Sequence, residues 1–156
     1  MAHLDTAIGE LRRVARHLMP EAILTFGLAR ALADLCEAAQ QAGSLRVQLQ
    51  TYGLAERLPS PTEAALYRMA QELLTNASRH ARAHHVLVQL MRHPDTLHLV
   101  VEDDGQGFDP ARAQAGVGLR SVRARAAYLG GILEVQSAPG QGTTVSFELA
   151  LLPAGS

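Results

Sequence analysis

The spacing of apolar residues changes along the chain from a helical to a strand-like period. Residues 4 to 42 show no strand-like alternation, and their apolar positions recur every three or four residues, which predicts helix. Pro20 separates two apolar stripes, and because proline lacks a backbone N–H we expect a bend or a new helical section there. The first stripe consists of Leu4, Ile8, Leu11, Val14 and Leu18, and the second of Ile23, Gly27, Leu28, Leu32, Leu35 and Ala39. Either the domain that follows covers these stripes, or they form a helical hairpin or bundle with a second chain.

Beyond Gly43 the apolar residues alternate with polar ones, as in strands with one buried face. The alternation predicts five strands, near residues 45–49, 86–90, 97–103, 132–137 and 143–149. A central helix begins at Ser60-Pro61 and ends near Arg82, and a second follows Gly116-Val117-Gly118 and ends at Leu129. We therefore predict an α+β fold, a two-layer sandwich in which a mixed sheet of about five strands carries helices on one face. A long helical segment precedes it.

The same alternation assigns polar residues to the covered face of the sheet. Asp103 shares its parity with Leu97, Leu99 and Val101, and Thr143 shares the parity of Val145 and Phe147. A buried carboxylate is costly unless it is hydrogen-bonded; the alternative is that Asp103, at a strand end, escapes to solvent. If both residues face inwards, they form the floor of a pocket suited to a flat heterocycle with an exocyclic amine.

The central helix carries a polar stripe that faces the rim of this pocket. Glu72, Asn76 and His80 are four residues apart and lie on one face, with Arg79 beside them. Such a stripe is ordinarily a solvated helix face. An acid and an amide beside a phosphate site also suit Mg²⁺, which takes few protein oxygens. Gly116 and Gly118, just before a helix, allow backbone N–H groups to close on an anion.

Composition excludes several other classes of protein. Fourteen basic and fifteen acidic residues argue against a nucleic-acid partner held by bulk charge. The single cysteine, Cys36, has no partner in the chain, which fits a reducing compartment, and the seven histidines lack zinc-ligand spacing. No apolar run is long enough to span a bilayer and no secretory signal is visible. We expect a cytoplasmic bacterial domain without membrane contact of its own, whether or not the whole protein is membrane-anchored.

Four motifs in this order resemble one family. Glu72-x-x-x-Asn76, Asp103-x-Gly105-x-Gly107, Gly116-x-Gly118-Leu119 and Gly142-Thr143 are similar to the motifs of the Bergerat ATP-binding fold, shared by sensor histidine kinases and the gyrase B ATPase. Residues 71–81 are most similar to the histidine kinases that signal to response regulators with helix-turn-helix outputs. The resemblance covers about residues 45 to 150.

The resemblance implies a role for each matching residue. Asn76 is implied as a ligand of Mg²⁺ on the phosphates, and Glu72 as the acid that orients metal-bound water. Asp103 is implied to accept the adenine amine and Thr143 to contact adenine through water. The remaining implied ATP contacts are the phosphate-binding Arg79 and His80, the glycines Gly105 and Gly107 that let the backbone close over the base, and the lid segment with Gly116, Gly118 and Leu119.

The N-terminal helices resemble part of the same kinases' dimerisation and phosphotransfer domain. We expect residues 1–42 to be such a partial domain without the phosphoacceptor helix, and residues 43–156 to be the catalytic domain. No histidine is followed by Asp or Glu, as the acceptor requires, and His17 is the weaker alternative. The resemblance implies a two-component histidine kinase that phosphorylates a histidine outside this chain, relays to a response regulator and dimerises through these helices. This chain alone is expected to bind ATP and not to autophosphorylate.

Two alternatives remain open. One is a stand-alone ATP-dependent serine kinase of the same fold, of the anti-sigma-factor type, and the other is a dimerisation module with a vestigial pocket. A Rossmann dinucleotide site fails on spacing, because Gly105-x-Gly107 is followed by Phe108-Asp109-Pro110 and not by x-x-Gly.

Overall fold

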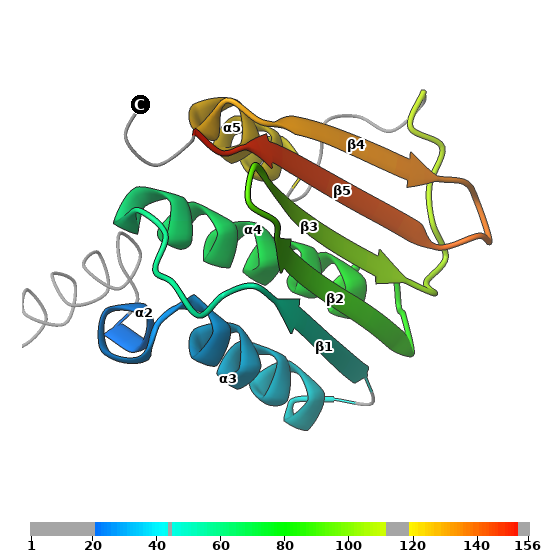
Figure 1. The fold of residues 1–156 in the computed structure, drawn as a ribbon. Coiled ribbons are helices and arrows are strands. Elements are labelled where there is room, and N and C mark those ends of the chain that lie inside the picture. The colour runs from blue at the N-terminus through cyan, green and yellow to red at the C-terminus, as the bar shows by residue number, and fades with distance from the viewer. Residues whose placement is uncertain (1–20, 44, 112–118, 153–156) are drawn as a thin grey trace, which may run out of the picture.

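In the computed structural model, which describes residues 21–43, 45–111 and 119–152, the chain forms two layers (Figure 1). One layer is a five-stranded sheet of order β1-β2-β3-β5-β4, in which β1 is parallel to β2 and the other pairs are antiparallel. The helices cover one face of this sheet (Figure 1). The predicted α+β sandwich with a mixed sheet is confirmed. The elements are α2 (Glu21–Phe26), α3 (Leu28–Gln41), β1 (Arg46–Tyr52), α4 (Ser60–Arg79), β2 (His85–Arg92), β3 (Thr96–Asp103), α5 (Leu119–Leu129), β4 (Ile132–Ser137) and β5 (Thr143–Ala150).

The core lies between the helical layer and the covered face of the sheet. Along β3 the buried residues are those of odd number, as the alternation predicted, and the opposite face is open. Among the largest side chains with almost no exposure are Phe147, Leu66, Met69, Leu90, Leu97 and Leu99. Within the described ranges, no helix combines the length and apolarity that a bilayer crossing needs.

The N-terminal helices pack against this same core. The predicted continuous stripe from Ile23 to Ala39 is wrong in one respect, because Gly27, with a φ of 87°, separates α2 from α3. That left-handed conformation is open to glycine and strained for other residues. Ile23, Leu28 and Leu32 are buried in the core cluster, so the domain that follows covers this second stripe. The first stripe, Pro20 and His17 lie outside the described residues, and the division at residue 42 stays a prediction.

An ion pair between the half-exposed Arg57 and the buried Glu63 joins α2 to the start of α4. Arg57 makes a bidentate contact to the carboxylate of Glu63, with its shortest distance 2.8 Å, and its Nη2 also donates to the carbonyl of Ile23 at 3.0 Å. The Glu63 side chain is only 3% exposed, so this pairing satisfies a charge that would otherwise be costly to bury.

The central helix ends three residues earlier than the sequence predicted, at Arg79 and not near Arg82. The amides of His80 and Ala81 both donate to the carbonyl of Asn76, which closes the last turn. Arg82 then takes a left-handed conformation with a φ of 50°. The prediction was too long because no glycine marks this cap in the sequence.

Candidate functional site

The register of the sheet brings the predicted floor residues together. Asp103 on β3 pairs directly with Thr143 on β5, which pairs in turn with Ser137 on β4. All three have the parity of the covered face, so they form one row beneath the helical layer at one end of the sheet. The predicted juxtaposition of Asp103 and Thr143 is confirmed.

Asp103 does not turn away into solvent. Its carboxylate is half-buried and accepts the backbone N–H of Gly105 at 2.9 Å. Burial raises the pKa of Asp103 above its ordinary value, while hydrogen bonds from the backbone of Gly105 and Thr143 act in the opposite direction. An acceptor that is only partly satisfied is suited to an amine donor from a ligand.

The loop after β3 is held against the C-terminal end of α4. Gln106 donates from its backbone N–H to the carbonyl of Ala81 at 2.8 Å and from its side chain to the carbonyl of His80 at 2.7 Å. On its other side, the carbonyl of Gln106 accepts the N–H of Gly140 in the β4–β5 turn at 2.6 Å. These three hydrogen bonds of Gln106, called the clamp below, fix the C-terminal end of α4 beside the row of Asp103, Thr143 and Ser137.

Two glycines of this loop are required by the packing of the chain itself. A Cβ on Gly105 would lie 2.5 Å from the carbonyl oxygen of Ala81, and one on Gly107 would lie 2.1 Å from that of Ala138. Gly107 also has a φ of 64°. This need is independent of any ligand; the approach of the two glycines to a base stays a prediction.

Asn76 lies on α4, one turn before the clamp. Among the described residues its side-chain oxygen is buried without a hydrogen-bond partner, which is costly unless a ligand supplies the missing interaction. A hard amide oxygen of this kind fits Mg²⁺, and the half-buried Glu72 stands one helical turn away on the same face. Arg79 and His80, in contrast, are exposed at the helix end.

The third motif is only partly described. Gly116 and Gly118 lie outside the described residues, so their predicted part in a lid stays a prediction. Leu119 is the first residue of α5 and packs partly buried against the core.

Ser137 is a residue of this site that sequence reasoning missed. Its hydroxyl accepts the N–H of Phe108 at 2.9 Å, donates to the carbonyl of Gly142 at 3.0 Å and lies 2.9 Å from the hydroxyl of Thr143. The alternation Leu133, Val135, Ser137 was a signal that placed it on the covered face.

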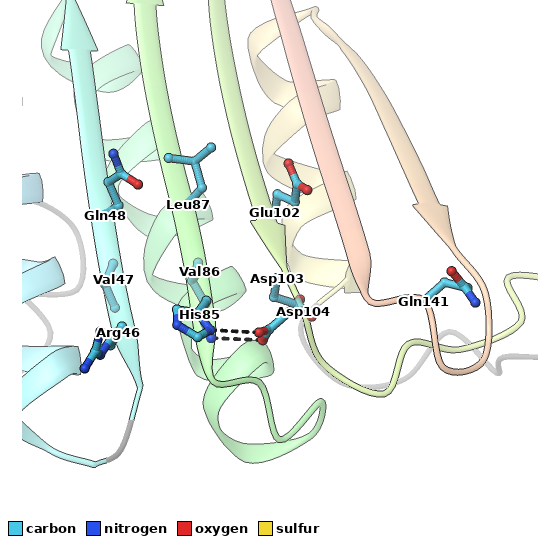
Figure 2. A pocket seen from close by; sticks show the side chains of 10 residues that line it. All are labelled: Arg46, Val47, Gln48, His85, Val86, Leu87, Glu102, Asp103, Asp104 and Gln141. Carbon is cyan, nitrogen blue, oxygen red and sulfur yellow. Dashed lines mark hydrogen bonds and ion pairs between the residues drawn. The ribbon is translucent and has the colours of Figure 1, made fainter.

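Sequence reasoning also missed Asp104, whose side chain lies beside His85 on the face of the sheet away from the helices. One of its carboxylate oxygens accepts the backbone N–H groups of His84 and His85 at 2.8 and 2.9 Å, and the other lies 2.9 Å from the His85 ring (Figure 2). These bonds lower its pKa to about 2. It lines a solvent-open cavity of about 490 Å³ whose wall also includes Asp103, together with Arg46, Gln48, Glu102 and Gln141 (Figure 2). Asp103 therefore borders both this cavity and the row that it shares with Thr143, and Thr143 is not among the described residues that line the cavity.

Comparison with known proteins shows the family of the chain. The family described as histidine kinase-, DNA gyrase B- and HSP90-like ATPase matches residues 62–153, which carry all four motifs. The chain belongs to this ATPase family. It is similar to the sensor histidine kinase MctS of Rhizobium johnstonii, with 32% identity over 96% of the chain, and to an uncharacterised sensor-like histidine kinase of Chloroflexus aurantiacus, with 36% identity over 88%.

A solved structure of the same class agrees. A blue-light-activated histidine kinase of Erythrobacter litoralis superimposes with a TM-score of 0.63 at 28% identity, over 77% of this chain and 40% of that one. The chain spans 32% and 24% of the lengths of the two curated relatives named above. It is an ATP-binding domain of this family, similar to those of sensor histidine kinases, and the nucleotide contacts of the covered row stay a prediction.

Proposed function

We propose that this domain positions Mg-ATP so that the γ-phosphoryl group passes to a histidine carried elsewhere in a two-component sensor kinase. The phosphoryl group is then relayed to an aspartate of a cognate response regulator. Two observations carry the proposal: a half-buried, partly satisfied acid, Asp103, and a buried amide oxygen without a partner in the described residues, Asn76. Backbone hydrogen bonds through Ala81 and Gln106 join the end of α4, where Asn76 lies, to the loop after Asp103. The first suits the adenine amine and the second suits the metal at the phosphates.

The chain's own residues bind and orient. Asp103 and Thr143 hold the base at the floor, Asn76 holds Mg²⁺ with Glu72 orienting its water, and Arg79 and His80 reach phosphate oxygens from the helix end. Bound Mg²⁺ neutralises charge on the transferred group, while positioning supplies most of the remaining rate enhancement. Gly116 and Gly118 form the hinge of the ATP lid in this proposal, and Leu119 is a further ATP contact.

The wider organisation belongs to the same proposal. Residues 1–42 form part of a dimerisation and phosphotransfer domain, and residues 43–156 form the catalytic domain of a homodimeric kinase. Because ATP and response regulators are found in the cytoplasm, the reaction is placed there. The resemblance of residues 10–28 to the second helix of such kinases supports this organisation.

Titration calorimetry with ATP, in Mg²⁺ and in EDTA, tests the proposal. The unaltered chain is expected to bind ATP more tightly with Mg²⁺, and Asn76→Ala to lose this difference. Ser78→Ala, an exposed change in the same turn, is the matched control and retains it. A full Mg²⁺ effect in Asn76→Ala contradicts the proposed metal ligand.

A further inference from the structure

One hydroxyl joins the three pieces of chain that surround the base end of the site. Ser137 Oγ contacts Phe108 of the loop after β3, Gly142 of the β4–β5 turn and Thr143 at the start of β5, all within 3.0 Å. Phe108 is 29 residues away in sequence. The hydroxyl is half-buried, so these bonds are shielded from competing water.

This contact removes the rotational freedom of the Thr143 hydroxyl. A serine hydroxyl has one proton and two lone pairs. The Phe108 N–H takes one lone pair and the Ser137 proton goes to the Gly142 carbonyl, so the remaining lone pair accepts the proton of the Thr143 hydroxyl. The Thr143 hydroxyl therefore points its proton at Ser137 and presents only its lone pairs beside Asp103, with which it is paired in the sheet.

We propose that Ser137 is a positioning residue that sets the base specificity of the site by fixing the Thr143 hydroxyl and the loop at Phe108. The inference rests on the proposed nucleotide function. The fixed Thr143 oxygen and the Asp103 carboxylate are two acceptors, which match the N–H donors of a 6-aminopurine amine and mismatch the oxygen of a 6-oxopurine. A freed hydroxyl rotates to suit either base, so discrimination falls.

The test compares ATP with inosine 5′-triphosphate, which differs only in carrying a 6-oxo group and a protonated ring nitrogen. Dissociation constants are measured by calorimetry for the unaltered chain, Ser137→Ala and Ser137→Thr. A site built to hydrogen-bond one base edge rejects the other because its polar groups are left unpaired. We expect the ratio of the two constants to fall about tenfold in Ser137→Ala, the size of one lost or mismatched polar contact. Ser137→Thr keeps the hydroxyl and is expected to keep the ratio.

A purely structural role gives a different result. Loss of packing alone lowers the melting temperature and weakens both nucleotides equally, so an unchanged ratio in Ser137→Ala overturns the proposal. If Ser137→Ala does not fold, Thr143→Val removes the oriented hydroxyl directly, and an unchanged ratio there overturns it too. Failure of the unaltered chain to bind either nucleotide would instead refute the proposed function.

Discussion

The adjacent carboxylates Asp103 and Asp104 are predicted to have opposite roles, although both follow one strand. Asp103 faces the covered row, where burial raises its pKa. Asp104 faces the open side, where the amides of His84 and His85 and the His85 ring lower its pKa to about 2. We predict that Asp103→Asn lowers ATP affinity with little effect on stability, and that Asp104→Asn lowers stability with little effect on ATP affinity.

The stability effect of Asp104 follows from its pKa. A decrease from 3.8 to about 2 would correspond to roughly 2.5 kcal/mol if fully expressed. The side chain is 47% exposed, so solvent screening reduces this to about 1 kcal/mol. For a chain of this size, that lowers the melting temperature by roughly 2–4 °C. Because the folded pKa is depressed, the contribution is present above about pH 4 and is lost as the pH falls towards 2.

The affinity effect of Asp103 follows from its hydrogen bonding. A bond to a charged acceptor contributes about 1.5–3 kcal/mol. Asparagine keeps one oxygen acceptor but loses the charge, so ATP binding is expected to weaken by about tenfold. Stability is not expected to fall, because burial already disfavours the ionised form in the folded chain. As its pKa is raised, protonation in acid should weaken ATP binding in the unaltered chain and not in Asp103→Asn.

Calorimetry for ATP affinity and thermal unfolding between pH 3 and 7 measure both effects on the same proteins. Equal loss of ATP affinity in the two variants would refute the assignment of the two faces. So would a larger drop in melting temperature for Asp103→Asn than for Asp104→Asn.

Three further predictions concern the frame of the site. Gly105→Ala places a Cβ 2.5 Å from the Ala81 carbonyl oxygen and is expected to lower the free energy of unfolding by about 1–3 kcal/mol, measured by thermal unfolding. Gly43→Ala, whose added Cβ would have nothing within 4 Å, is the control. Equal effects of the two changes would contradict the close packing of Gly105 against Ala81. Arg82→Gly removes the backbone strain of a left-handed residue with a φ of 50°. It is expected to raise the free energy of unfolding by about 0.5 kcal/mol after the entropy of glycine is counted. A lower melting temperature would show that the Arg82 side chain stabilises the fold. Arg57→Gln leaves the Glu63 carboxylate buried and unpaired, so we expect a lower melting temperature. Adding Glu63→Gln in a double variant is expected to restore part of the loss. If the two changes in melting temperature simply add, the pairing is ruled out.

The sheet and one half of the site could be predicted from sequence because both depend on alternation. Parity alone placed Asp103 and Thr143 on the covered face, and the register later brought them together. Ser137 escaped notice because its partner Phe108 lies in a distant loop, and no local pattern reports such contacts. Asp104 escaped because its bonds run to the start of another strand. The helix break at Gly27 was hidden because an apolar stripe continues across a single left-handed residue.

The central claim is that Asp103 and Asn76 hold opposite ends of one metal-bound nucleotide. A crystal structure of this chain with Mg²⁺ and a non-hydrolysable ATP analogue tests it most directly. We predict the adenine amine within hydrogen-bond distance of the Asp103 carboxylate and the metal on the side-chain oxygen of Asn76. An adenine amine bonded to Asp104 in place of Asp103 (Figure 2), or a metal without contact to Asn76, would contradict the account.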